Sequence, residues 1–206
     1  MNHKNRMLQG LAYLASDKEL KELREVCKEK LFELNHLNPS NRKEIPNILS
    51  KIFNKVGENA WIEPPFQCDY GFNIEIGDNF FSNYNLVILD VGKITIGNNV
   101  LFGPNVSLLA ATHPLHPVSR ATGLESGSPI SIGDNCWLGG NVIVNNGVSI
   151  GENCVIGSGS VVTKNIPANS LAYGNPCRVI REMTEEDRLR YDKDKEFDEE
   201  VICLIK

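Results

Sequence analysis

Residues 132–162 read IGDNCWLGGNVIVNNGVSIGENCVIGSGSVV. An aliphatic side chain returns every six positions in this stretch, and glycine or asparagine follows most of these side chains. A period of six fits neither an amphipathic helix nor a strand that alternates along its whole length. It predicts a chain that turns a corner every six residues and stacks on itself as a parallel β-helix. The recurring positions are Ile132, Leu138, Val144, Ile150, Ile156 and Val162.

The same phase occurs earlier in the chain. It is clear at Ile96, Phe102 and Leu108, and less regular at Ile62, Cys68, Ile74 and Ile76. Leu108 and Ile132 are separated by a multiple of six. We therefore expect the chain between them to leave the coil as a loop, about residues 110–129, and to rejoin it in register. This loop carries His113.

The chain divides into three predicted segments. Residues 1–56 form a helical cap, because apolar side chains recur there at helical spacing, for example at Leu20, Leu23, Cys27, Leu31 and Leu34. Residues 57–174 form the β-helix with its excursion loop. Residues 175–206 are highly charged and predict a short amphipathic helix or a frayed tail.

Composition excludes several classes of function. The formal charge of -5 over 206 residues includes no basic stripe, so nucleic acid is not an expected partner. No apolar run is long enough to span a membrane, and the polar start predicts no signal peptide, so we expect a cytoplasmic protein. The six cysteines form no CxxC pair, which favours buried thiols in a reducing compartment.

Several short motifs accompany the repeat. They are Glu63-Pro64-Pro65, Cys68-Asp69-Tyr70-Gly71, Ala111-Thr112-His113-Pro114, Val162-Thr163-Lys164 and Gly174-Asn175-Pro176, with Gly10, Tyr13 and Asp17 in the cap. With them the chain resembles the maltose/galactoside O-acetyltransferase group of the hexapeptide-repeat acyltransferases over nearly all its length. The resemblance implies a left-handed parallel β-helix, an exception to the usual right-handed crossover. It also implies a homotrimer with active sites between subunits, acetyl-CoA as donor and a sugar hydroxyl as acceptor.

A hydroxyl that attacks a thioester needs a base, and histidine is suited to this role near neutral pH. His113 occupies the catalytic position of the family, and Pro114 stiffens its backbone. The alternative is a structural loop histidine, and His116 is a weaker candidate on the same loop. Glu125 matches an acidic position of the maltose-type enzymes, where it would orient His113 or bind acceptor hydroxyls. Alternatively, Glu125 is an ordinary surface glutamate.

The resemblance also predicts the residues that bind the acceptor. Asp and Asn suit a polyol because their oxygens and amides bind vicinal hydroxyls, although both are also common at coil corners. Two residues of the helical cap would reach the site from outside the coil. The predicted acceptor residues are Tyr13, Asp17, Asp69, Asn83 and Asp90.

A third set is predicted to bind CoA. Trp137 occupies an outward position of its coil and would pack on the pantetheine arm. Gly139 and Gly140 would offer a backbone amide to the oxyanion, or serve only as corner glycines. A threonine and three cationic residues near the end of the repeat would face the CoA phosphates, or be ordinary surface residues. These predicted phosphate-binding residues are Thr163, Lys164, Arg178 and Arg181.

Three other functions compete with a simple-sugar O-acetyltransferase. Zinc carbonic anhydrases of this fold need three histidines, and only His113 and His116 are suitably placed, so no metal is expected. A non-enzymatic β-helix scaffold is argued against by the polar His-Pro loop. A xenobiotic or sugar-nucleotide acyltransferase shares the fold, but Tyr13 and Asp17 favour the simple-sugar group. Glu125 favours glucose or maltose over galactosides as the acceptor.

Overall fold

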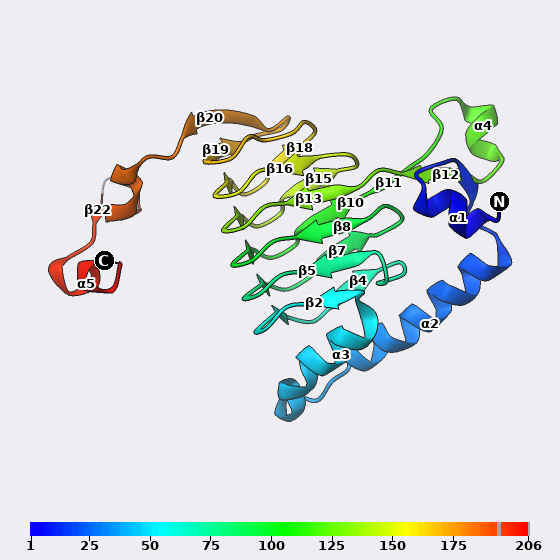
Figure 1. The fold of residues 1–206 in the computed structure, drawn as a ribbon, viewed down its shortest axis with the longest axis horizontal. Helices are drawn as coiled ribbons and strands as arrows, with labels where there is room; N and C mark the ends of the chain where they lie inside the picture. Colours follow the sequence, from blue (N-terminus) through cyan, green and yellow to red (C-terminus); the bar gives the residue numbers. More distant parts are fainter. Residues whose placement is uncertain (193–194, 206) are drawn as a thin grey trace.

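A computed structural model describes residues 1–192 and 195–205. Of the predicted C-terminal segment, residues 193–194 and 206 lie outside the described residues. The centre of the molecule is a stack of coils, with helices along one side and a C-terminal arm on the other (Figure 1). Among the described residues, no helix is long and apolar enough to cross a membrane.

Each coil contributes one short strand to each of three parallel sheets, which we name after their first strand. The β2 face contains β2 (Lys55–Val56), β5 (Ile74–Ile76), β8 (Ile94–Ile96), β13 (Ile130–Ile132) and β16 (Ser149–Ile150). The β4 face contains β4 (Phe66–Cys68), β7 (Leu86–Leu89), β10 (Ser107–Leu109), β15 (Ile143–Asn145) and β18 (Val161–Val162). The β3 face contains β3 (Trp61–Ile62), β6 (Phe81–Ser82), β9 (Leu101–Phe102), β14 (Trp137–Leu138), β17 (Val155–Ile156), β19 (Ser170–Tyr173) and β20 (Arg178–Glu182). The predicted parallel β-helix is confirmed.

The aliphatic period places one side chain of each strand inside the coil. Every recurring position from Ile62 to Val162 is buried, including the less regular early ones. Strand pairing stacks like on like, for example Ile96 on Ile132 and Ile132 on Ile150. The core is therefore a continuous column of aliphatic side chains, with each strand edge satisfied by the coil above it.

One row of corners is built by asparagines in the left-handed conformation, with φ between 54° and 58°. Their side chains form a ladder in which each Nδ2 donates to the Oδ1 of the next coil over 2.9–3.1 Å. Asparagine suits this position because it tolerates positive φ and also bonds locally. The ladder residues are Asn59, Asn79, Asn99, Asn135, Asn153 and Asn169.

The N-terminal helices close the lower end of the coil and one side of it (Figure 1). Asp17 is the N-cap of the longest helix, where its side chain accepts the amide of Leu20. The apolar stripe of that helix, including Leu31 and Leu34, packs into the same core as the coils. These elements are α1 (His3–Leu8), α2 (Lys18–Asn35), η1 (Pro39–Glu44) and α3 (Ile45–Ile52).

The chain leaves the coil after Ala110 and returns at Ser128, whose amide donates to the Ala110 carbonyl over 3.1 Å. Between these residues lie β11 (Ala111–Thr112), α4 (Pro117–Ala121) and β12 (Leu124–Gly127). Strand β12 pairs with β11 and with β1 (Tyr13–Leu14) of the cap. This small antiparallel sheet joins the excursion loop to the N-terminal segment.

The C-terminal arm begins with β20, which pairs antiparallel with β19 at the last coil. Beyond it the arm extends away from the coils (Figure 1). It contains η2 (Glu185–Leu189), β21 (Arg190–Asp192), β22 (Lys195–Glu196) and α5 (Glu199–Ile205).

Candidate active site

The candidate site lies where the repeat departs from its period of six. On the corner that follows the β4 face, Cys68 and Ile76 are eight positions apart, and so are Ile88 and Ile96. In the third coil the same corner carries the excursion loop. Three successive insertions therefore stack on one another, while the next coils have shorter corners, of six positions from Val144 to Ile150 and four from Val162 to Ile166.

These insertions and the helical cap enclose a cavity of about 310 Å³. Its polar lining residues come from three separate parts of the chain, namely the cap, the first insertion and the excursion loop. Apolar side chains of the second insertion form part of the wall. The cavity is lined by Ala15, Arg24, Asp69, Tyr70, Leu89, Val91, Ala111, His113 and Glu125.

The structure brings three predicted residues together, because His113, Glu125 and Asp69 all line this cavity. His113 is exposed and directly follows β11. His116 has a different environment, since it is the N-cap of α4 and its Nδ1 accepts the amide of Val118 over 3.3 Å. Of the two loop histidines, only His113 lines the cavity.

Glu125 is held by the small sheet between loop and cap. Tyr13 and Glu125 are paired residues of β1 and β12, and the Tyr13 hydroxyl donates to Oε2 of Glu125 over 2.9 Å. Tyr13 is fully buried, and burial together with this carboxylate raises its pKa well above the usual value for tyrosine. Tyr13 therefore stays protonated, and its hydroxyl is directed to Glu125; its direct contact with the sugar stays a prediction.

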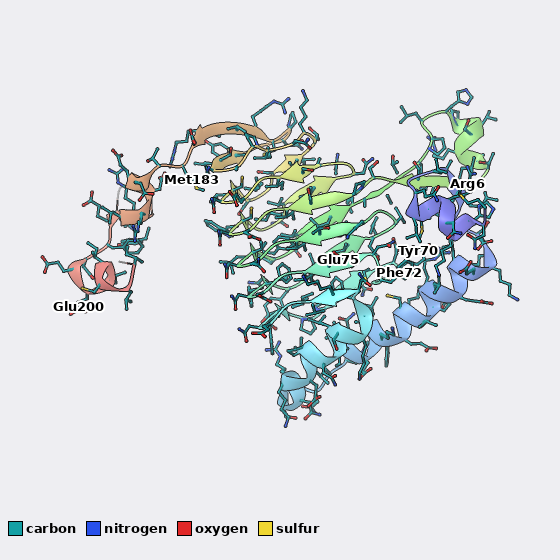
Figure 2. All side chains as sticks on the ribbon, in the orientation of Figure 1. Arg6, Tyr70, Phe72, Glu75, Met183 and Glu200 are labelled. Atoms are coloured by element: carbon teal, nitrogen blue, oxygen red, sulfur yellow. The ribbon has the colours of Figure 1, made fainter. Side chains whose placement is uncertain are left out.

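The floor of the cavity is the turn formed by residues 69–73. Burial raises the pKa of the Asp69 carboxyl, and the nearby Arg24 guanidinium opposes this shift. Arg24 reaches from α2, where it donates to the Tyr70 hydroxyl and to the Ala15 carbonyl. Figure 2 shows Tyr70 and its neighbour Phe72 on the side of the coils nearest the cap.

Sequence reasoning missed Arg24 and Tyr70. Tyr70 stood within a quoted motif, and the eight-residue spacing around it was the available signal. Arg24 lies on a helical surface among many charged residues. Only its contacts in the folded structure distinguish Arg24 from the other charged residues of this helix.

Two predicted acceptor residues have other tasks in the structure. Asp17 caps α2 and does not line the cavity. Asp90 has no exposed surface through which to touch a sugar, and its Oδ1 accepts the amides of Asp69 and Tyr70, each over 2.9 Å. Both side chains thus support elements of the site in place of the predicted contact.

Asn83 is also outside the cavity of its own chain. It follows β6 at a corner of the β3 face, and its Oδ1 accepts the amide of Tyr84. Its predicted role in acceptor binding therefore requires a cavity other than the one its own chain forms.

The predicted CoA residues form a group separate from this cavity. Trp137 is 54% exposed on the β3 face, and Thr163 and Lys164 are exposed directly after β18. Arg178 and Arg181 lie on β20, where Arg181 pairs with Asp187 through two hydrogen bonds of 2.6 and 2.7 Å. None of these residues lines the described cavity.

The two corner glycines differ in what they can offer. The Gly139 amide already donates to the Ile156 carbonyl over 2.8 Å, so only Gly140 could supply the predicted oxyanion donor. Gly139 has a steric reason as well, since a Cβ there would lie 2.5 Å from Oγ of Ser158 and 2.7 Å from its amide nitrogen. Its smallness is therefore required by the stacking of the coils.

Within residues 1–192 and 195–205, no group of three or more histidine, cysteine, aspartate and glutamate side chains is arranged to hold a metal ion.

Comparison with protein families gives two matches. Residues 6–57 match the maltose acetyltransferase hexapeptide capping motif, and residues 129–164 match the hexapeptide repeat of succinyl-transferase. The first match covers the helices up to the first coil, and the second covers the stretch with the clearest period of six.

Comparison with individual proteins gives similar chains of nearly equal length. The chain is 45% identical to the galactoside O-acetyltransferase of Escherichia coli over 171 residues, which is 83% of this chain and 84% of that protein. It superimposes with a TM-score of 0.88 on a maltose O-acetyltransferase from Clostridium difficile, at 47% identity, covering 90% of this chain and 99% of the other. A galactoside acetyltransferase in complex with coenzyme A gives 0.93 at 44% identity, with coverages of 96% and 99%.

Proposed function

The chain belongs to the maltose/galactoside O-acetyltransferase group of the hexapeptide-repeat acyltransferases, and we propose that it acetylates a simple sugar with His113 as general base. Acetyl-CoA is its cosubstrate. The observation that carries the proposal is the single cavity in which His113, Glu125 and Asp69 meet. It combines a base with two carboxylates that can bind hydroxyl groups.

In the proposed reaction, His113 removes the proton of a sugar hydroxyl as its oxygen attacks the thioester carbonyl carbon. A new C–O bond forms, and the C–S bond breaks when the tetrahedral intermediate collapses. His113 then returns the proton to the departing CoA sulfur. The Gly140 amide would stabilise the oxyanion while it exists.

The carboxylates define the acceptor that the cavity would select. Asp69 and Glu125 accept hydrogen bonds from neighbouring hydroxyls, and the Arg24 guanidinium donates to a ring or hydroxyl oxygen. Glu125 is fixed by Tyr13 and faces the same cavity as the base. This arrangement supports glucose or maltose as the preferred acceptor within the family.

A homotrimer would complete the site. The outward residues of the β3 face form an apolar column of Trp61, Phe81, Leu101, Trp137, Val155 and Leu171. The outward residues of the β2 face are polar, namely Lys55, Glu75, Thr95, Ser131 and Ser149. This contrast supports packing of the β3 face against a neighbouring copy, because exposed apolar columns of this kind are typical of interfaces.

The edge of the β4 face supports the same assembly. Leu89 of the cavity pairs with Leu109, and Leu109 pairs with Asn145 in successive coils. Thr163 follows β18, one coil further, which places it roughly 14 Å along the axis from Leu89. We propose that the pantetheine arm follows this edge, with Trp137 of a neighbouring copy as the opposite wall.

A panel of acceptors tests the proposal. The purified protein is incubated with acetyl-CoA and with glucose, maltose, galactosides, a sugar nucleotide or a xenobiotic hydroxyl compound, and release of free thiol is followed. We expect the fastest release with glucose or maltose. Faster turnover of a galactoside would overturn the acceptor preference only. No release with any simple sugar, but release with a sugar nucleotide, would overturn the sugar O-acetyltransferase proposal.

A further inference from the structure

Asp90 is a buried carboxyl whose contacts lead to the cavity floor. It belongs to the second insertion, in the coil next to the one that carries the first. Its Oδ1 accepts two consecutive backbone amides, those of Asp69 and Tyr70, and its own carbonyl accepts Nδ2 of Asn73 over 2.7 Å. Asp90 thus fastens both ends of the turn formed by residues 69–73.

This turn presents side chains to the acceptor cavity. Asp69 and Tyr70 both line it, and the Tyr70 hydroxyl is bonded by Arg24 of the cap. The turn is also confined from behind, because a Cβ on Gly71 would lie 2.5 Å from the Ile52 carbonyl oxygen. Gly71 itself has a φ of 76°, which glycine adopts without strain.

Burying a carboxyl group costs free energy unless its oxygens are fully hydrogen-bonded. Asp90 is 0% exposed, and within the described chain its Oδ2 has no hydrogen-bond partner. The group therefore costs stability where an apolar residue would not. In the described chain, the hydrogen bonds of its side chain to other residues are those with the turn.

We propose that Asp90 is a positioning residue for the acceptor, which fixes the 69–73 backbone and so the direction in which Asp69 and Tyr70 face the cavity. This inference rests on the proposed function, because the turn matters for catalysis only if the cavity binds the acceptor. Asp90 does not touch the sugar or the reacting atoms. Its effect is transmitted through two backbone amides.

The test compares Asp90→Ala with Asp90→Asn. Asparagine keeps an Oδ1 that can accept the two amides, whereas alanine removes the acceptor. We expect Asp90→Ala to raise the KM for the best sugar by about 10- to 100-fold, the usual effect of losing such bonds. The KM for acetyl-CoA should stay within about twofold, and Asp90→Asn should stay near the wild type in both constants.

Ile96→Ala serves as a control for general loss of stability. Ile96 is buried in the core of the coils, and its strand partners, Ile76 and Ile132, lie outside the 69–73 turn. This variant should lower the melting temperature without raising the KM for the sugar selectively. An Asp90→Ala protein that remains folded with an unchanged sugar KM would overturn the inference, and so would an equal rise in both KM values.

Hydrogen–deuterium exchange of the 66–73 peptide gives a readout independent of activity. Exchange should accelerate in Asp90→Ala and remain slow in Asp90→Asn and Ile96→Ala. If the wild type acetylates no sugar, the proposed function fails, whereas the exchange result still decides whether Asp90 fixes the turn. Equal protection of this peptide in all variants would refute the positioning role.

Discussion

At the scale of single residues, the cavity depends on side chains that act through one another. His113 lines the cavity, the Tyr13 hydroxyl bonds Glu125, and Asp90 bonds the turn that carries Asp69. A variant at each position should therefore change a different kinetic or thermodynamic constant.

His113→Ala should lower kcat by roughly 10²–10⁴-fold, because the sugar hydroxyl would lose its base. The KM for acetyl-CoA should change little, since the residues predicted to bind the CoA phosphates lie outside the cavity. Steady-state kinetics with the best sugar measures both constants. His116→Ala is the matched control and should be mild, because His116 caps α4 outside the cavity lining. Near wild-type turnover by His113→Ala would show that the loop is only a lid.

Tyr13→Phe should lower kcat/KM for the sugar by about 10- to 100-fold, the usual effect of one hydrogen bond to a carboxylate. The change removes the hydroxyl that orients Glu125 and leaves the buried ring in place. Tyr84→Phe is the control, since Tyr84 is 49% exposed and lies outside the cavity lining. An equal effect of the two variants would argue against an orienting role for Tyr13.

Asp90 should also make stability depend on pH. Burial raises its pKa from 3.8 to about 6, so the folded state binds this proton more tightly than the unfolded state. The stabilisation is therefore complete below about pH 4 and is lost as pH rises through 6, with an upper limit of about 3 kcal/mol. Urea unfolding from pH 4 to 8 measures it. Subtracting the Asp90→Asn curve should isolate this slope, and parallel curves would contradict the assignment.

At the scale of elements, corners determine where the coil is regular and where it opens. The asparagine ladder keeps one row of corners identical from Asn59 to Asn169. The corner after the β4 face instead takes insertions in the first three coils. A rigid row and a variable row on the same solenoid allow a cavity to form without disturbing the core.

We expect the asparagine ladder to contribute to the free energy of unfolding. Asn99→Ala removes two ladder bonds and also puts alanine at a φ of 56°, so we expect a loss of about 2–4 kcal/mol. Asn141→Ala is the matched control, with a φ of 60° and, in the described chain, no side-chain hydrogen bond. It should cost only the strain, about 1–2 kcal/mol. Equal losses in chemical denaturation would mean that the ladder contributes nothing.

At the scale of the whole molecule, the predicted site is divided between two groups of residues. The acceptor group surrounds the cavity, while Trp137 lies on the β3 face outside it. An assembly in which the β3 face of one copy meets the β4 edge of another would join these groups. Cyclic symmetry would then create one shared site per interface.

Mixed assemblies test this arrangement. His113→Ala and Trp137→Ala chains, each inactive alone, are unfolded together and refolded. Random mixing should restore about a quarter of the wild-type activity. About a quarter of the sites then combine an intact His113 from one chain with an intact Trp137 from its neighbour. Mixing His113→Ala with Glu125→Gln is the control and should restore none, since both residues line the cavity of one chain. Absence of recovery in the first mixture, or an active monomer in sedimentation, would contradict a shared site.

The sequence by itself determined the repeat and the buried column, and it supplied His113 as the candidate base. The period of six is a local pattern, so each coil specifies its own corners and core residues, and the recurring aliphatic positions from Ile132 to Val162 are all buried. The period also predicted where the loop leaves the coil, because Leu108 and Ile132 are separated by a multiple of six. His113 and Glu125 could be proposed because they stand in short contiguous motifs that the resemblance made recognisable.

Only the tertiary structure decided which residues meet. Tyr13 and Glu125 are 112 positions apart, and Arg24 and Tyr70 are 46 apart, so no local pattern links them. Asp17 and Asp90 have the right chemistry for a sugar, yet one caps a helix and the other is buried under a turn. Their tasks depend on which elements the coil brings alongside, and that is fixed by packing of the cap and stacking of the corner insertions.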